Sequence, residues 1–310
     1  MAMRSFQHTV PARVGLLGNP SDLYEGTVIG FALADFSATV KLVEADSGGV
    51  QAMGPAAELL GAAWKRIERR LPPDAPTPHF ALTAETGIPL QVGLSGSSAI
   101  VVAALCAMEE CLGLHSTPFE LAEEALAVET EELGLLAGPQ DRVIQVYGGL
   151  LCMDFSNPRS AERYQQLDPG LLPPLLVAWN PNPGEASGTA HQLVYEAWQA
   201  GDVATRAGMS AIGDLARDGY GALIQRDAER LGQLIDRNFD HRRELFGLDS
   251  VASAPVELAR QEGAAAKFCG SGGAVVALAR DQAHLTRLGQ AYEAFGWHSV
   301  RPCVAPASAR

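Results

Sequence analysis

Gly93-Leu94-Ser95-Gly96-Ser97-Ser98-Ala99 is a loop of small residues that leads directly into an apolar run ending near Leu114. The run predicts a helix over Ser97–Leu114 that is apolar nearly all round and therefore buried. The N–H groups and the positive dipole end at such a helix start attract phosphate, and small residues let a phosphate approach the backbone. The segment is equally typical of a plain N-capped helix, and it is not a Walker A loop because no Gly-Lys-Ser/Thr follows.

A second glycine-rich segment lies near the end of the chain. It reads Lys267-Phe268-Cys269-Gly270-Ser271-Gly272-Gly273 and runs into the apolar stretch Ala274–Leu278. Three glycines before a predicted strand indicate backbone pressed against another part of the molecule. Taken alone, the segment is more typical of a tight turn or a bulge.

A third segment, Pro11–Asp22, combines an apolar strand with a polar turn. Arg13 stands at the start of the strand, and Asn19-Pro20-Ser21-Asp22 follows its end. Arginine can bind phosphate or carboxylate with two parallel hydrogen bonds. The alternative is a surface turn, because Asn-Pro-Ser-Asp is strong turn chemistry.

Strand and helix patterns alternate around these segments. Thr117-Pro118-Phe119-Glu120 is a capping box with proline at the first helical position, which predicts a helix running to about Gly134. Further strands are predicted over Thr39–Ala45, His79–Ala84, Gly149–Phe155, Leu175–Trp179, Gly273–Leu278 and Ser299–Val304, and helices from about Ser187 to Gln261 and over Asp281–Phe295. The pattern predicts an α+β fold of two lobes, residues 1–165 and 166–310, divided in the Pro-, Gly- and Ser-rich stretch Ser156–Pro174.

Composition excludes several classes of protein. The chain has 310 residues with a formal net charge of -13, and no extended basic cluster that would mark a nucleic-acid binder. Five cysteines without a CxxC pair argue against zinc and against a disulfide framework. The first residues lack the apolar core of a secretory signal, and the longest apolar stretch, Ala99–Met108, is too short to span a bilayer. We therefore expect a cytoplasmic protein with no nucleic-acid or membrane partner.

Taken in chain order, the three segments resemble the GHMP kinase superfamily. Members carry a substrate-side motif near the N-terminus, a Gly-Leu-x-Ser-Ser-type phosphate loop about one third along the chain, and a glycine-rich motif near the end. Gly96, between Ser95 and the Ser97-Ser98 pair, is a small departure. The stretches Ala12–Asp22, Gly93–Ile100, Ala137–Gly149, Met153–Ser156 and Ala265–Val276, with Asn238-Phe239-Asp240 and Arg242-Arg243, are most similar to the branch that phosphorylates glucuronate. The resemblance implies a ribosomal-protein-S5-like N-terminal lobe and a ferredoxin-like C-terminal lobe.

The resemblance also implies catalytic roles. Asp141, which follows Gly138-Pro139-Gln140, corresponds to the base that takes the proton of the substrate hydroxyl, and Arg13 to the arginine beside the transferred phosphate. From the residues alone, Asp141 is more typical of an aspartate at a helix start, and a structural ion pair is the alternative for Arg13. The implied ATP and phosphate contacts are Gly93, Leu94, Ser95, Gly96, Ser97, Ser98, Gly270, Ser271 and Gly272. Mg²⁺ would be held by Ser98 and by one glutamate of the next helix, Glu129 in preference to Glu131 or Glu132.

Asn19, Ser21, Asp22 and Tyr24 match the segment that contacts the sugar in related kinases. The carboxylate of glucuronate should be met by an arginine, with Arg142 as first candidate and Arg243 as second. The implied reaction is ATP-dependent phosphorylation of the anomeric hydroxyl, giving glucuronate 1-phosphate and ADP. Two alternatives stay open, namely a GHMP kinase for another sugar such as galacturonate or a galactose-like sugar, and a non-catalytic sugar- or nucleotide-binding protein on the same fold.

Overall fold

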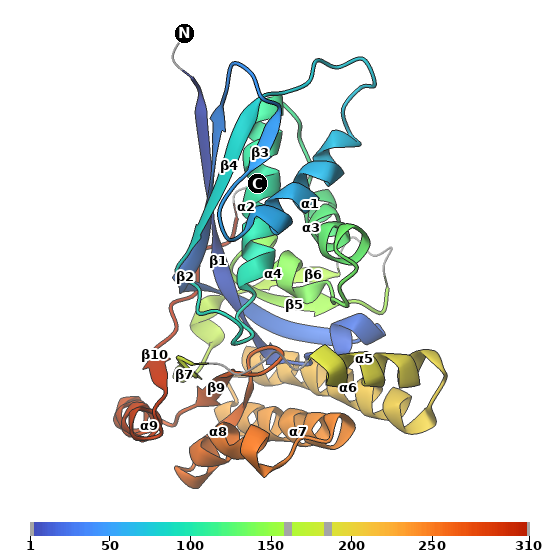
Figure 1. Cartoon of the computed structure of the whole chain (residues 1–310). Coiled ribbons are helices and arrows are strands. Elements are labelled where there is room, and N and C mark those ends of the chain that lie inside the picture. Colours follow the sequence, from blue (N-terminus) through green and yellow to red (C-terminus); the bar gives the residue numbers. More distant parts are fainter. Residues whose placement is uncertain (1–2, 158–162, 183–187, 309–310) are drawn as a thin grey trace.

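The computed structural model describes residues 3–157, 163–182 and 188–308 and has the predicted two-lobed α+β architecture (Figure 1). The first sheet is built on two long antiparallel strands, β1 (Ser5–Leu17) and β2 (Thr27–Glu44). Because β2 is 18 residues long, its second half pairs with β4 (Phe80–Thr86) and its first half with β5 (Leu150–Asp154). The sheet is completed by β3 (Val50–Ala52) beside β4 and by β6 (Tyr164–Leu167) beside β5.

Helices cover one face of this sheet (Figure 1). The central one, α2 (Gly96–Leu112), is buried from Ser98 to Glu109, which confirms the predicted buried helix. The capping box is also confirmed, because the Thr117 hydroxyl accepts from the Glu120 N–H at 3.2 Å and the Glu120 carboxylate accepts from the Thr117 N–H at 2.8 Å. The remaining helices of this lobe are α1 (Ala57–Glu68), α3 (Pro118–Ala127) and α4 (Gln140–Tyr147).

The helix predicted from Thr117 to about Gly134 continues as far as Glu132, but its last turn is not α-helical. The α-helix ends at Ala127, and Val128–Glu132 forms a π-helical turn. Single π turns are frequent at functional sites because they re-aim side chains relative to the helix before them. Here the turn carries Glu129, which is buried, while Glu131 next to it is largely solvent-exposed.

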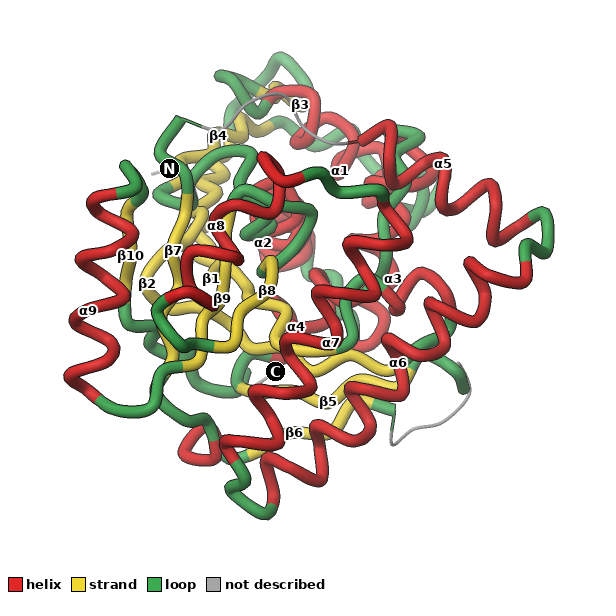
Figure 2. Tube along the Cα trace, turned by 90° about the horizontal axis from the view of Figure 1, so that it is seen from below, coloured by secondary structure: helices red, strands yellow, loops and turns green. Residues whose placement is uncertain are grey.

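The second lobe contains a four-stranded antiparallel sheet in the order β10-β7-β9-β8. Its strands are β7 (Leu175–Trp179), β8 (Ala265–Phe268), β9 (Ala274–Leu278) and β10 (His298–Val300), and its helices are α5 (Gly188–Gln199), α6 (Val203–Ile224), α7 (Ala228–Phe246), α8 (Ser250–Gln261) and α9 (Gln282–Ala294). The sequence predicted β7, β9 and β10, although β10 is shorter than expected. It did not predict β8. Figure 2 shows α6 and α7 side by side across the lower face of the molecule.

Two short 3₁₀ turns, η1 (Ser21–Tyr24) and η3 (Pro169–Leu171), connect elements of the fold. The first sheet ends at Leu167 and the second begins at Leu175, so we place the lobe boundary in this region. The exact division after residue 165 stays a prediction, and residues 158–162 of the predicted linker and the predicted helix start at Ser187 lie outside the described residues.

The two lobes are interlocked rather than merely consecutive. α6 packs on β2, and the C-terminal segment returns to the first lobe, where Val304 pairs with Leu33 and Ala307 with Gly148. Within the described residues, no helix combines the length and apolar character needed to cross a bilayer.

Candidate active site

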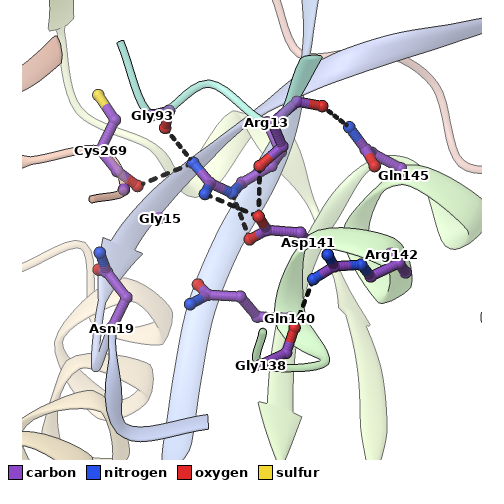
Figure 3. A network of polar contacts seen from close by, with 12 residues as sticks. Arg13, Gly15, Asn19, Gly93, Gly138, Gln140, Asp141, Arg142, Gln145 and Cys269 are labelled. Carbon is purple, nitrogen blue, oxygen red and sulfur yellow. Dashed lines mark hydrogen bonds and ion pairs between the residues drawn. The ribbon is translucent and has the colours of Figure 1, made fainter. Parts of the chain in front are cut away.

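The three segments singled out in the sequence meet where the two lobes join. Arg13, which is 4% exposed, donates from Nε to Asp141 Oδ1 at 2.7 Å and from Nη2 to Asp141 Oδ2 at 3.0 Å. Its Nη1 donates to the carbonyl oxygens of Gly93, at 2.6 Å, and of Cys269, at 3.1 Å (Figure 3). One guanidinium therefore joins β1, the loop before α2, the start of α4 and the C-terminal glycine segment.

The two glycine-rich loops touch backbone to backbone. Gly93 has φ +75°, and a Cβ there would lie 2.9 Å from the Gly272 oxygen and from the Ser271 nitrogen. A Cβ on Gly270 would lie 2.2 Å from the Gly93 oxygen. Real side chains do not fit at such distances, so the glycines at 93 and 270 are required by the close approach of the loops.

Ser95 caps α2 in an unusual way. Its backbone is left-handed, with φ 64° and ψ 46°, which is uncommon for a residue with a side chain and is often found at functional sites. Its hydroxyl donates to Asp141 Oδ2 at 2.5 Å, and its carbonyl accepts from Gln145 Nε2 at 2.8 Å. Ser98 is buried in the first turn of the helix, and Ser97 is exposed.

Asp141 keeps one open position. A carboxylate offers about four acceptor positions. Arg13 and Ser95 together fill three of them, one on Oδ1 and two on Oδ2. The side chain is 19% exposed, so Oδ1 can accept a hydrogen bond from a bound hydroxyl.

Asp22 connects the turn after β1 to the turn before α4. Its Oδ1 accepts from Gln140 Nε2 at 2.7 Å and its Oδ2 from the Gln140 N–H at 3.2 Å. A Cβ on Gly138 would lie 2.1 Å from Asp22 Oδ2, so glycine is required there. Burial, and secondly the neighbouring Asp141 carboxylate, raise the pKa of Asp22 to about 7.

Replacement of Asp22 by asparagine should stabilise the protein more at pH 8 than at pH 5. The pKa of Asp22 rises from 3.8 to about 7 on folding, so its contribution to stability is complete below about pH 4 and is lost as the pH rises through 7. Asparagine removes this loss, and Gln140 Oε1, which has no partner, can turn to accept from the new amide. The stabilisation of Asp22→Asn relative to wild type, expressed as unfolding free energy, should be about 1–3 kcal/mol larger at pH 8 than at pH 5.

The measurement is the difference in thermal unfolding midpoint between Asp22→Asn and wild type at each pH. Asp214, an exposed aspartate outside the site, provides the control, because its replacement by asparagine changes no buried charge. Equal differences for Asp22→Asn at both pH values would contradict the prediction.

The other substrate-side residues have mixed environments. The Ser21 hydroxyl donates to the Thr27 carbonyl at 3.2 Å and so anchors the turn. Tyr24 is buried with its hydroxyl unpartnered, and burial raises its pKa to about 12. Its ring packs against those of Tyr195 and Trp198. Asn19 is buried, and its Oδ1 accepts from Lys267 Nζ.

Arg142 and Glu129 form a buried ion pair with each other. Arg142 also donates to the Gly138 carbonyl at 2.6 Å, and its burial lowers its pKa to about 9. Its charge is therefore matched by a protein carboxylate, and its assignment to the substrate carboxylate stays a prediction. Glu129 Oε1 has no hydrogen-bond partner, whereas Glu131 pairs with Arg66 of α1 and Glu132 with Arg69, directly after that helix.

Arg243 is not brought to the site. It lies on the side of α7 that faces α8, where it pairs with Asp240 and Glu257. The adjacent Arg242 turns inward and donates to the carbonyls of Gly270 and Ser271, at 2.7 and 3.1 Å.

Sequence reasoning missed Arg242, but a signal was available. Asn238 and Arg242 are four residues apart, so they share a face of α7. Asn238 is fully buried and accepts from the Gly18 N–H at 2.7 Å. A polar residue on the buried face marks that face, rather than the face of Arg243, as the one directed at the site.

A phosphate-type loop at a buried helix start, an arginine–carboxylate pair beside it and two interlocked α+β lobes define the class of two-lobed small-molecule kinases. Residues 58–149 match the GHMP kinases N terminal domain, and residues 220–296 match the GHMP kinases C terminal family. Glucuronokinase 1 of Arabidopsis thaliana is 36% identical over 313 residues, which cover 89% of this chain and 85% of that protein. The chain belongs to the GHMP kinase family.

Other relatives share less sequence. A D-glycero-alpha-D-manno-heptose 7-phosphate kinase of Campylobacter jejuni is 29% identical over 179 residues, 50% of this chain and 52% of its own. The crystal structure of Lactococcus lactis galactokinase complexed with galactose superposes with a TM-score of 0.83 at 13% identity, covering 98% of this chain and 95% of that one. This last similarity establishes the fold.

Proposed function

We propose that the protein is an ATP-dependent kinase that phosphorylates the anomeric hydroxyl of D-glucuronate to give glucuronate 1-phosphate and ADP. The observation that carries the proposal is the Asp141 carboxylate, held by Arg13 and by Ser95 of the loop at the start of α2. The identity with a glucuronokinase over most of both chains supports the choice of sugar.

In this proposal Asp141 is the general base. Its open acceptor position on Oδ1 receives the hydrogen bond of the anomeric hydroxyl and takes its proton as the oxygen attacks the γ-phosphate. Arg13 fixes the carboxylate in place from one side and offers positive charge next to the transferred group. Asp22, through its two hydrogen bonds to Gln140, holds the turn from which Asp141 extends.

The loop Gly93–Ser98 would bind the ATP phosphates through its N–H groups, with the backbone of Gly270–Gly272 packed against it. A magnesium ion fits the residues expected to hold it, because Glu129 carries a buried oxygen without a partner and Ser98 lies in the first turn of α2. When bound, the ion would neutralise phosphate charge. Among the residues that the structure describes, no group of three or more His, Cys, Asp or Glu side chains forms a separate metal site.

The proposal is tested by ADP release with ATP, magnesium and a panel of glucuronate, galacturonate, glucose, galactose and mevalonate. We expect turnover with glucuronate to exceed turnover with every other member of the panel. Faster turnover with another sugar would keep the kinase and discard glucuronate. Tight binding of ATP without turnover of any member would favour the binding-protein alternative.

A further inference from the structure

Several buried polar atoms near Asp22 have no hydrogen-bond partner. They include Asn19 Nδ2, Tyr24 Oη, Gln140 Oε1 and Arg242 Nε, and Arg142 Nε lies in the same region. Buried polar groups are nearly always hydrogen-bonded, so a group of exceptions in one region indicates a place where a polar ligand completes the bonding. Asn19, Tyr24 and Arg242 offer donors, and a ligand rich in acceptors would satisfy them.

Arg242 supplies the charge in this region. It is 2% exposed, and its guanidinium donates to two carbonyl oxygens of the C-terminal glycine segment. Its Nη2 also lies 3.4 Å from His191 Nε2. Its Cζ lies over the rings of Phe246 and Phe268, 5.2 and 5.7 Å from their centroids. Burial and the adjacent Arg242 lower the pKa of His191 to about 4, so the imidazole is neutral and its Nε2 can accept. Within the described ranges, no carboxylate forms an ion pair with Arg242.

The region has more buried positive charge than negative charge. Arg242 lies within electrostatic reach of Arg13 and Lys267, and Lys267 is fully buried. Lys267 Nζ lies within hydrogen-bond distance of three oxygens that can only accept, on Gly15, Asn19 and Phe268. Satisfying all three takes three N–H groups, which only the charged ammonium form carries. Burial nevertheless lowers the pKa of Lys267 well below its ordinary value.

Two carboxylates stand against the two arginines and the amine of Lys267. Asp141 is already matched by Arg13, and Asp22, with its pKa near 7, is only partly ionised at neutral pH. Uncompensated buried charge is costly, and an anion entering from outside would relieve it.

We infer that Arg242, together with the free donors of Asn19 and Tyr24, binds the carboxylate of the sugar acid. This inference rests on the proposed function and names the residue that selects an acidic over a neutral sugar. A phosphate group of the nucleotide is the other anion that could bind Arg242. The carboxylate is favoured because Arg242 lies over the ring of Phe246, which packs in the same hydrophobic cluster as Tyr24 of the predicted sugar-binding segment. Arg142, by contrast, already has Glu129.

The experiment compares glucuronate with glucuronamide, a neutral analogue of the same shape, by calorimetric binding in the presence of a non-hydrolysable ATP analogue. Wild type should prefer the acid. Arg242→Gln should weaken binding of glucuronate by about 10- to 100-fold, the usual range for losing a hydrogen bond to a charged group, and binding of glucuronamide by much less. Arg243→Gln, its neighbour on the outer face of α7, is the matched control and should leave both affinities unchanged.

A second variant keeps the test informative if Arg242→Gln does not fold. Asn19→Asp places a carboxylate against Lys267 Nζ, which already donates to this side chain, so the fold should be retained or stabilised. The new negative charge should repel glucuronate and reverse the preference towards glucuronamide. An Asn19→Asp protein that still prefers the acid would overturn the inference.

The remaining outcomes separate the subsite from the reaction. If Arg242→Gln loses affinity for glucuronate and glucuronamide equally, or loses affinity for the ATP analogue instead, Arg242 does not bind the sugar carboxylate. Loss of the preference in Arg142→Gln with retention in Arg242→Gln also overturns the inference. Wild type that prefers glucuronate but releases no ADP would disprove the kinase reaction and leave the subsite standing.

Discussion

Asp141→Asn should lower kcat with glucuronate by about 10²- to 10⁴-fold, the range that general-base catalysis usually contributes. The amide keeps the shape of the side chain and can still accept one hydrogen bond from Arg13, but it cannot take a proton. Affinity for the ATP analogue should change little, because in the proposed mechanism the loop Gly93–Ser98 would bind phosphate through its own backbone. Initial rates of ADP release and nucleotide binding by calorimetry check both parts.

The control for this variant is Asp214→Asn, which replaces an exposed aspartate that pairs with Arg217 on the surface of α6. It should have wild-type kcat. A kcat for Asp141→Asn within about tenfold of wild type would show that the carboxylate serves only to pair with Arg13. Thermal unfolding of both variants distinguishes a loss of chemistry from a loss of fold.

The elements that were predicted correctly are those whose signals are local. The buried helix α2 follows from an unbroken apolar run, and the start of α3 follows from the Thr117–Glu120 capping box. The π turn at Val128–Glu132 has no such signal. Its side chains are directed by partners outside the turn: Glu129 turns inward to Arg142 of α4, and Glu131 pairs with Arg66, 65 residues earlier.

Strand β8 was missed for a related reason. It contains Lys267, a charged residue that is atypical of a buried strand. The structure accommodates it because its ammonium group reaches Gly15 and Asn19, about 250 residues earlier in the chain. A partner at such a separation leaves no pattern in the local sequence.

The candidate site shows the same difference between local signals and partners that are distant in the sequence. Resemblance to a family proposes roles for Arg13 and Asp141, but the direct pairing of these side chains, 128 residues apart, becomes visible only in three dimensions. The choice between Arg242 and Arg243 depends on helix phase, because successive residues of an α-helix point about 100° apart. Reading the buried face of α7 from Asn238 would have selected Arg242.

Arg13→Met should be the most damaging single change at the site for both stability and activity. It removes four hydrogen bonds at once, two to the Asp141 carboxylate and one each to the carbonyls of Gly93 and Cys269. Among the described residues, Asp141 then keeps only the Ser95 hydroxyl as a side-chain donor, and its negative charge is no longer matched. Breaking a buried ion pair by removing one partner costs about 3–5 kcal/mol of unfolding free energy. Removing a preorganised charge beside the reacting group costs about 10²- to 10³-fold in kcat. Arg237→Met, at an exposed position of α7, is the control and should change neither quantity.

A double-mutant cycle decides whether Arg13 acts through Asp141. If the pair works as one unit, Arg13→Met combined with Asp141→Asn should be less damaging to kcat than the two single losses multiplied together, because the second change removes a group that has already lost its function. Arg13→Lys helps to separate charge from geometry. A lysine keeps the positive charge but cannot hold both carboxylate oxygens and two carbonyls at once. Strictly multiplicative losses would mean that Arg13 contributes independently, through the loops at Gly93 and Cys269, rather than by holding the base.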